Sequence, residues 1–200
     1  MSGFEYKDQV VEQIKLNRAI DDRTIYIYEV IDNDECMKIS AYIDRIVEQD
    51  LEDNIAEPEP IVLKINSGGG IIYHSMHVIG RIDYLQDFKN YEFHANIEGI
   101  CASAALDIAL TCKKVTCWAT SSIMYHSGGG QAYGTPNNIE FDYKEIRRLW
   151  DLGCKIALKH TKVTQEWLDN VYSTNSDFWM DANKALELGF VDEVLGTLHL

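Results

Sequence analysis

The chain has 200 residues, of which 46% are hydrophobic and 25% are charged, so it is long enough for one domain with a substantial core. Its formal net charge of −14 repels nucleic acid and anionic membranes, so we expect it to bind neither. Five cysteines without a CxxC pair indicate a reducing compartment, and the many charges within residues 1–18 do not fit a signal peptide. We therefore expect a cytoplasmic protein with a single domain over residues 1–200, in which residues 1–20 form an N-terminal arm.

Runs of β-branched and aromatic residues alternate with helical patterns in the first half of the chain. In chain order they predict a weak helix at 5–16, a strand at 24–31, a helix from a cap at 32–34 to residue 47, an acidic surface loop at 48–60, a strand at 61–65, a glycine turn at 66–70 and a helix at 71–88. The strand at 61–65 is almost continuously apolar, which is typical of a sheet that is covered on both faces.

The same alternation continues in the second half of the chain. It predicts a strand at 91–98, a buried helix at 103–111, strands at 115–118 and 123–126, a long helix at 137–161, helices at 165–171 and 181–188, and a final strand at 190–195. This order indicates right-handed βαβ units and a mostly parallel sheet. The apolar run at 100–112 is interrupted by Asp107 and is too short to span a bilayer.

A serine and a histidine stand where two of these strands end. Ser103 lies among small residues at the expected corner between a strand and a helix, where its hydroxyl would be exposed beside helix-start N–H groups. His126 ends a later strand and is followed by Ser127 and three glycines, and it would be able to take a proton from that hydroxyl. Either residue alone is more often structural, but together they favour a serine hydrolase, most simply a peptidase.

The glycine turn Asn66-Ser-Gly-Gly-Gly70 has three possible uses. It can be a plain turn. It can also cradle a phosphate, but not as a Walker loop, because no Lys-Ser/Thr pair follows it. It can also form an oxyanion hole, because glycine lets backbone N–H groups approach a substrate carbonyl closely. In a parallel sheet this turn would lie at the same carboxyl edge as Ser103.

The remaining polar candidates are less informative. The chain has too many carboxylates for composition to select the one that would orient His126. His74 and His77 are three residues apart on an expected helix, but they have no evident third ligand for a metal. We therefore expect neither a metal nor a cofactor.

Four segments together carry a resemblance to a known family. They are Ile65-Asn-Ser-Gly-Gly-Gly70, Gly99-Ile-Cys-Ala-Ser103-Ala-Ala105, Met124-Tyr-His126, and Asp177-Phe-Trp-Met-Asp-Ala-Asn-Lys-Ala185 running into Leu188-Gly-Phe-Val-Asp192. In this order they resemble the proteolytic subunit of the Clp protease family, the ATP-dependent serine peptidases. The resemblance runs from about the first strand to the C-terminus.

The resemblance implies a role for each matched position. Ser103 would be the nucleophile, His126 the general base and Asp177 the acid that orients it, with Asn175 as the competitor if the alignment slips by two residues. The backbone N–H groups of Gly70 and Ala104 would form the oxyanion hole. The residues implied to contact the substrate are Gly69, Ile71, Gly128 and Gly129.

The resemblance also implies the fold and the assembly. The fold would be the α/β fold of the Clp peptidase and crotonase clan, with repeated ββα units, a mostly parallel sheet and a protruding handle at 127–161, made of a strand at 128–134 and the helix at 137–161. Two heptameric rings would stack as a tetradecamer around a chamber that degrades unfolded polypeptides, with an AAA+ unfoldase as the partner that consumes ATP.

Some positions depart from the family pattern. Gly68 stands where the family has proline, Glu29 where it usually has glycine, and the residues after His126 are Ser-Gly-Gly-Gly instead of Gln-Pro-x-Gly-Gly. These departures fit a divergent, for example phage-encoded, member and leave the unfoldase open. Two alternatives remain at this stage: an acyl-CoA enzyme of the crotonase type, and a ring subunit without catalytic activity.

Overall fold

The computed structural model describes residues 11, 13–14, 17 and 19–197. Most of the predicted N-terminal arm at 1–20, with its weak helix at 5–16, lies outside these residues. Within the described chain, strands and helices alternate as β1(Thr24–Ile27), α2(Asn33–Glu52), β2(Ile61–Ser67), α3(Ile72–Lys89), β3(Phe93–Ala102), α4(Ala104–Thr111), β4(Lys114–Trp118), β5(Ser122–Tyr125), α5(Pro136–His160), α6(Gln165–Thr174), β6(Phe178–Asp181), α7(Ala182–Leu188) and β7(Glu193–Leu195). The prediction of an α/β fold with a mostly parallel sheet is confirmed.

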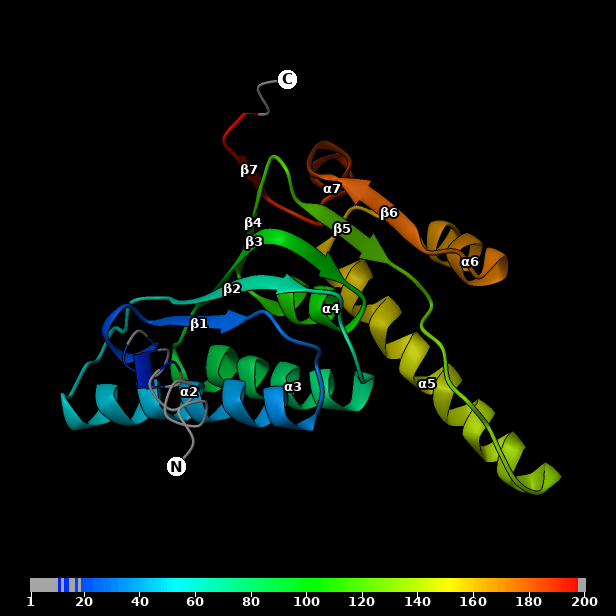
Figure 1. Ribbon diagram of the computed structural model, residues 1–200, viewed down its shortest axis with the longest axis horizontal. Helices are drawn as coiled ribbons and strands as arrows, with labels where there is room; N and C mark the ends of the chain where they lie inside the picture. The colour runs from blue at the N-terminus through cyan, green and yellow to red at the C-terminus, as the bar shows by residue number, and fades with distance from the viewer. Residues whose placement is uncertain (1–10, 12, 15–16, 18, 198–200) are drawn as a thin grey trace.

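The described strands form one sheet, with the order β1-β2-β3-β4-β7 and with β5 branching from β3 (Figure 1). Every pair is parallel except β5 with β6, which is antiparallel. The long strand β3 pairs with β4 through its first half and with β5 through its second half. This branching brings the ends of β3 and β5 together, which places the two strand-end residues of interest side by side.

Helices α2 and α3 lie together along one face of the sheet, and α4 packs against α3 beneath β2 and β3 (Figure 1). Isoleucines and leucines fill the space between these layers, and the side chains of Ile61, Leu63 and Ile65 on β2 are fully buried. Burial of this apolar area is the main stabilising contribution to the fold, at about 25 cal/mol per Å². The packed layers support the carboxyl edge of the sheet.

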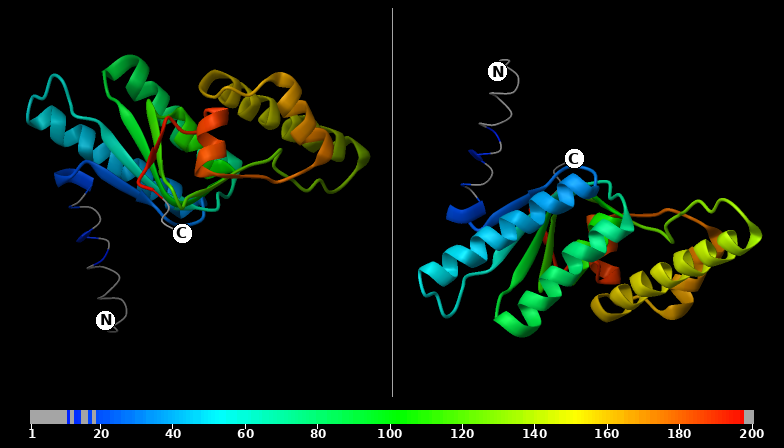
Figure 2. Two further views of the ribbon diagram at one scale, coloured as in Figure 1. Left: turned by 90° about the horizontal axis from the view of Figure 1, so that it is seen from above. Right: turned by 90° about the horizontal axis from the view of Figure 1, so that it is seen from below.

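Helix α5 leaves the body of the molecule (Figures 1 and 2). Its buried residues, the first of which is Leu149, all lie in its C-terminal half, where Trp150 stacks on Tyr172 of α6. Its N-terminal half is exposed, as the predicted protruding helix requires. The segment 128–134 before it forms no strand within this chain, because positive φ angles at Gly128 and Gly134 interrupt the extended backbone and no neighbouring strand of the described chain pairs with it.

Some predicted boundaries were wrong. Helix α2 continues to Glu52 instead of ending at residue 47, because residues 48–52 contain no glycine or proline that would break it. The first strand ends at Ile27, and only an isolated bridge from Ile31 to Gly70 continues its direction. Strand β6 was not predicted, because its four residues are too few for a recognisable alternation.

Candidate active site

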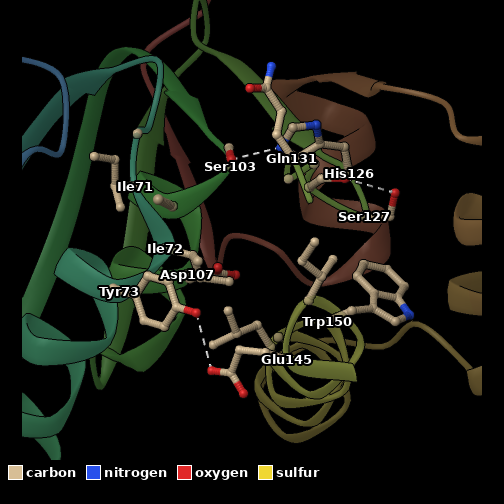
Figure 3. Close-up of a pocket in the computed structure, with 18 of the residues that line it drawn as sticks. Ile71, Ile72, Tyr73, Ser103, Asp107, His126, Ser127, Gln131, Glu145 and Trp150 are labelled. Atoms are coloured by element: carbon tan, nitrogen blue, oxygen red, sulfur yellow. Dashed lines mark hydrogen bonds between the residues drawn. The ribbon is translucent and has the colours of Figure 1, made fainter. Parts of the chain in front are cut away.

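Ser103 occupies the corner between β3 and α4, as the sequence predicts. Its φ of 55° and ψ of −127° are an unusual conformation for a residue with a side chain. The N–H of Ser103 donates to the C=O of Met124 at 3.0 Å, and its C=O accepts from the N–H groups of Leu106 and Asp107. The neighbouring β5 and the first turn of α4 therefore hold the strained backbone in place, and the hydroxyl faces the pocket (Figure 3).

His126 reaches Ser103 because β5 runs parallel to β3 in a register that pairs Ala102 with Met124. The strand ends one residue before His126, whose Nε2 atom lies 2.7 Å from Ser103 Oγ (Figure 3). The side chain of His126 is 27% exposed, so it is partly sheltered and still open to the pocket.

Asp177 completes a hydrogen-bonded chain of three residues. It precedes β6, whose antiparallel register pairs Phe178 with Tyr125, so that Asp177 lies opposite His126. Its Oδ1 atom is 3.0 Å from His126 Nδ1. A carboxylate only accepts, so Nδ1–H donates to Asp177 and Nε2 is left to accept the hydroxyl proton of Ser103. The side chain of Asp177 is 58% exposed, which screens its charge.

Asn175, the competing candidate for the third position, ends helix α6 in a left-handed conformation with φ of 47°. Its N–H donates to the C=O of Tyr172 at 3.2 Å. The hydrogen bond to His126 Nδ1 is therefore made by Asp177, and Asn175 has a different position as the C-cap of α6.

The glycine turn packs directly against the Ser103 corner. Gly69 has a φ of +91°, and a Cβ atom added to it would lie 2.5 Å from Ala102 O and 2.8 Å from Ser103 Cβ. The bridge to Ile31 uses the C=O of Gly69 and the N–H of Ile71, so the N–H of Gly70 between them points the opposite way along the extended chain. Only glycine fits this close approach of two backbone segments.

Two N–H groups are thus available in the wall of the pocket that holds Ser103. Gly70 supplies one, and the other belongs to Ala104, the first residue of α4, whose N–H has no acceptor within its own helix. Both residues line the pocket that holds Ser103 and His126. Two amide donors at a helix start and a glycine turn can stabilise a developing oxyanion.

The pocket has a volume of about 560 Å³ and separates the sheet edge from α5 (Figure 3). Of the residues that the family resemblance implied in substrate contact, Ile71, Gly128 and Gly129 line it. Gly69 is not among the lining residues, because its N–H donates to Ser67 Oγ and its C=O accepts from Ile31. The structure therefore gives Gly69 a packing contact beneath the site.

The pocket contains a carboxyl group to which the sequence analysis assigned no role. Asp107 lies in its wall, four residues after Ser103 and one turn further along α4. Burial raises the pKa of Asp107 from 3.8 to about 7, because desolvation penalises its charged form. The signal was present in the sequence, since Asp107 is the charge that interrupts the apolar run at 100–112 and shares a helix face with Ser103.

The described residues offer no metal site and no membrane-spanning helix. Among them, no group of three or more His, Cys, Asp or Glu side chains is placed to hold a metal ion. His77, one of the two histidines weighed as ligands, has its Nε2 atom 3.2 Å from Ser40 Oγ. None of the described helices has the length and hydropathy that crossing a membrane would require.

A serine on a strand-to-helix corner, hydrogen-bonded through histidine to aspartate and flanked by two amide donors, is the arrangement that defines serine hydrolases as a class. Comparison with known proteins narrows this class. The chain belongs to the Clp protease family, whose family model matches residues 7–197.

Several curated relatives carry the same description, "ATP-dependent Clp protease proteolytic subunit". The one from Bacteroides thetaiotaomicron is 30% identical over 183 residues, which cover 90% of this chain and 77% of the relative. The one from Dehalococcoides mccartyi is 25% identical over 200 residues, covering 94% of this chain and 95% of the relative. The one from Carsonella ruddii is 24% identical over 187 residues, covering 90% and 87%.

Proposed function

We propose that the chain is a serine endopeptidase that hydrolyses peptide bonds through an acyl-enzyme. The observation that carries this proposal is the hydrogen-bonded chain from Asp177 through His126 to Ser103, at 3.0 Å and 2.7 Å, beside a pocket large enough for a peptide side chain. Membership of the Clp protease family supports it and favours a peptidase over an acyl-CoA enzyme or an inactive subunit.

The reaction follows from the geometry. Ser103 Oγ attacks the substrate carbonyl carbon while its proton moves to His126 Nε2, and Asp177 stabilises the imidazolium. The carbonyl oxygen, now negatively charged, accepts hydrogen bonds from the N–H groups of Gly70 and Ala104. The intermediate collapses as His126 protonates the leaving amine, and water then hydrolyses the acyl-enzyme by the same steps in reverse order.

We further propose that the chain works as a homo-oligomer, as stacked heptameric rings that form a tetradecamer, in the cytoplasm and with an AAA+ unfoldase that supplies unfolded polypeptide. Large apolar side chains on the projecting half of α5 support assembly, since Ile139, Phe141 and Tyr143 are 44%, 69% and 58% exposed. The ATP-dependent description of the relatives supports an unfoldase, which would consume the ATP while the chain itself needs no cofactor.

The test of the proposed function is hydrolysis of unfolded casein and short fluorogenic peptides by the purified chain. Ser103→Ala should lower the hydrolysis rate by at least about a thousandfold, because the covalent step is removed. Ser122→Ala is the matched control, since Ser122 is an exposed serine on β5 that does not line the pocket, and it should leave the rate unchanged. Equal rates for the wild type and Ser103→Ala would contradict the proposal.

A further inference from the structure

We propose that Asp107 makes the pocket beside Ser103 select peptides with a lysine or arginine side chain immediately before the cleaved bond. This inference deepens the proposed peptidase function and rests on it. It assigns a specificity-determining role to a carboxyl group that the proton-transfer steps do not use.

Asp107 lies close to the reacting atoms, in the same pocket as Ser103. Its N–H donates to the C=O of Ser103 at 3.2 Å, and both residues line the same pocket. One helical turn separates them, which is about 5.4 Å along α4. The Tyr73 hydroxyl donates to Glu145 Oε1 at 3.3 Å on the far side of the pocket, and in Figure 3 Asp107 is drawn between Ser103 and these two residues.

The oxyanion hole fixes where a substrate side chain would enter. With the carbonyl carbon at Ser103 Oγ and its oxygen between the N–H groups of Gly70 and Ala104, the adjoining side chain starts at the Ser103 end of the pocket. A lysine or arginine side chain is long enough to cover the one-turn distance to Asp107. Short side chains such as alanine or serine are not.

Among the described residues, no lysine or arginine side chain competes for the carboxylate of Asp107. It forms no hydrogen bond or ion pair with any residue that the structure describes, and no lysine or arginine is among the residues lining the pocket. Burial of a carboxyl without a partner is unfavourable, and a bound cation offsets that cost. The raised pKa of Asp107, about 7, follows from the desolvation of its carboxyl group in the pocket wall.

The rest of the pocket adds to the preference for a long cationic side chain. Asp142 and Glu145 of α5 also line it, so that the field in the pocket is negative, although Arg148 pairs with Glu145 at 2.7 Å outside the lining. Ile72, Ile146 and Leu149 provide apolar contact for the methylene groups of such a side chain.

The test uses N-acetylated peptidyl diphenyl phosphonates, which differ only in the side chain at the phosphorus-bearing residue: lysine, its uncharged counterpart norleucine, or leucine. Acetylation removes the α-amine, so the side chain is the only cation. Ser103 Oγ forms a bond to phosphorus, one phenoxide leaves, and the serine proton accompanies it as phenol. The rate of adduct formation on Ser103 is measured by mass spectrometry on the purified, assembled protein.

The expected result is that the lysine probe labels wild-type Ser103 at least about tenfold faster than the norleucine probe, as a charge-assisted contact predicts. In Asp107→Asn the lysine and norleucine probes should label Ser103 at nearly equal rates. In Asp107→Leu the norleucine and leucine probes should label Ser103 faster than they do in the wild type. Asp87→Asn, which removes an exposed carboxylate from α3, should keep the wild-type ratio.

A ratio of lysine-probe to norleucine-probe labelling rates of one or less in the wild type would overturn this inference. So would a ratio that Asp107→Asn leaves unchanged. The wild-type ratio alone decides the matter if the Asp107 variants do not fold. A small alkyl fluorophosphonate, which carries no side chain for the pocket, distinguishes a failure of the proposed role of Asp107 from a failure of the proposed peptidase function. If it labels Ser103 while the lysine preference is absent, only the role of Asp107 fails; if it does not label Ser103, the proposed function fails as well.

Discussion

At the scale of the residue, the site depends on how closely two backbone segments approach each other. The glycine turn packs on the Ser103 corner so tightly that a Cβ atom on Gly69 would lie 2.5 Å from a backbone oxygen. The adjacent Gly68 has open space around it. These two neighbouring glycines therefore allow a matched experiment on the alignment of the nucleophile.

Gly69→Ala should displace the Ser103 corner, because the new methyl group cannot fit and the φ of +91° is strained for alanine. We expect at least about a hundredfold loss in peptide hydrolysis, by analogy with the cost of small misplacements of catalytic groups. Gly68→Ala is the control and should retain activity. Equal activity in the two variants would show that the turn does not position Ser103.

Asp107 also makes a prediction about stability. In the unfolded chain its carboxyl ionises near 3.8, whereas burial raises its pKa to about 7 in the fold, so the folded state retains a proton that the unfolded state releases. Stability should therefore fall as the pH rises from about 4 through 7, by at most about 4 kcal/mol from this group.

Urea unfolding of the wild type and of Asp107→Asn, at pH 5 and pH 8 and at one protein concentration, measures this difference. The wild type should lose more stability than the variant between the two pH values. Parallel losses in both proteins would show that the carboxyl of Asp107 is not desolvated.

Most of the candidate site could be predicted at this scale. Ser103 and His126 follow from small and glycine-rich residues at strand ends, and the sequence pattern placed both at one edge of the sheet. The sequence marks Asp107 as an unusual charge in an apolar helix, but its proposed role could not be predicted, because a single carboxylate there does not show whether it faces a core or a cavity. Asp177 came from the resemblance alone, since its place opposite His126 depends on the short antiparallel strand β6.

At the scale of the element, one ion pair joins the start of β1 to α2. Arg23 Nη1 lies 2.7 Å from Asp50 Oδ1, with side-chain exposures of 17% and 9%, and Arg23 Nε donates to the C=O of Glu59. Removing one partner of a buried pair leaves the other charge without compensation.

Arg23→Ala should therefore lower the free energy of unfolding by about 3 kcal/mol. Arg45→Ala is the control, because the partners of Arg45 are Glu48, Gln49 and Glu52 of its own helix and its ion pairs are exposed, so its loss should cost less than about 1 kcal/mol. Chemical denaturation measures both. Similar losses would indicate that the Arg23–Asp50 pair is weakened by solvent.

The helices and strands were predictable where their patterns are long and periodic, as in α3 and α5. The missed features are short or depend on contacts distant in sequence. Four residues are too few to identify β6, and the end of β1 depends on its bridge to the glycine turn. The extension of α2 beyond residue 47 shows that an acidic sequence can continue a helix when no breaking residue intervenes.

At the scale of the whole molecule, the projecting half of α5 carries apolar side chains that the described chain does not cover. Phe141 is 69% exposed, and the N-terminal half of the helix projects from the body of the molecule (Figures 1 and 2). Under the proposed assembly, a second copy buries this surface.

Phe141→Asp should therefore lower the molecular mass measured by light scattering, because it removes buried apolar area and introduces a charge. Asn137→Asp adds the same charge at an exposed polar position of the same helix and should leave the mass unchanged. If Phe141→Asp keeps the wild-type mass, this face of α5 is not an interface between copies.

The most direct measurement of the central claim is to map, by mass spectrometry, the adduct of an alkyl fluorophosphonate on the assembled protein. Ser103 Oγ forms a bond to phosphorus, fluoride leaves, and His126 takes the proton. The adduct should form on Ser103, and at least about a hundredfold more slowly in His126→Ala. An adduct on a different serine, or labelling of Ser103 at the same rate without His126, would contradict the account.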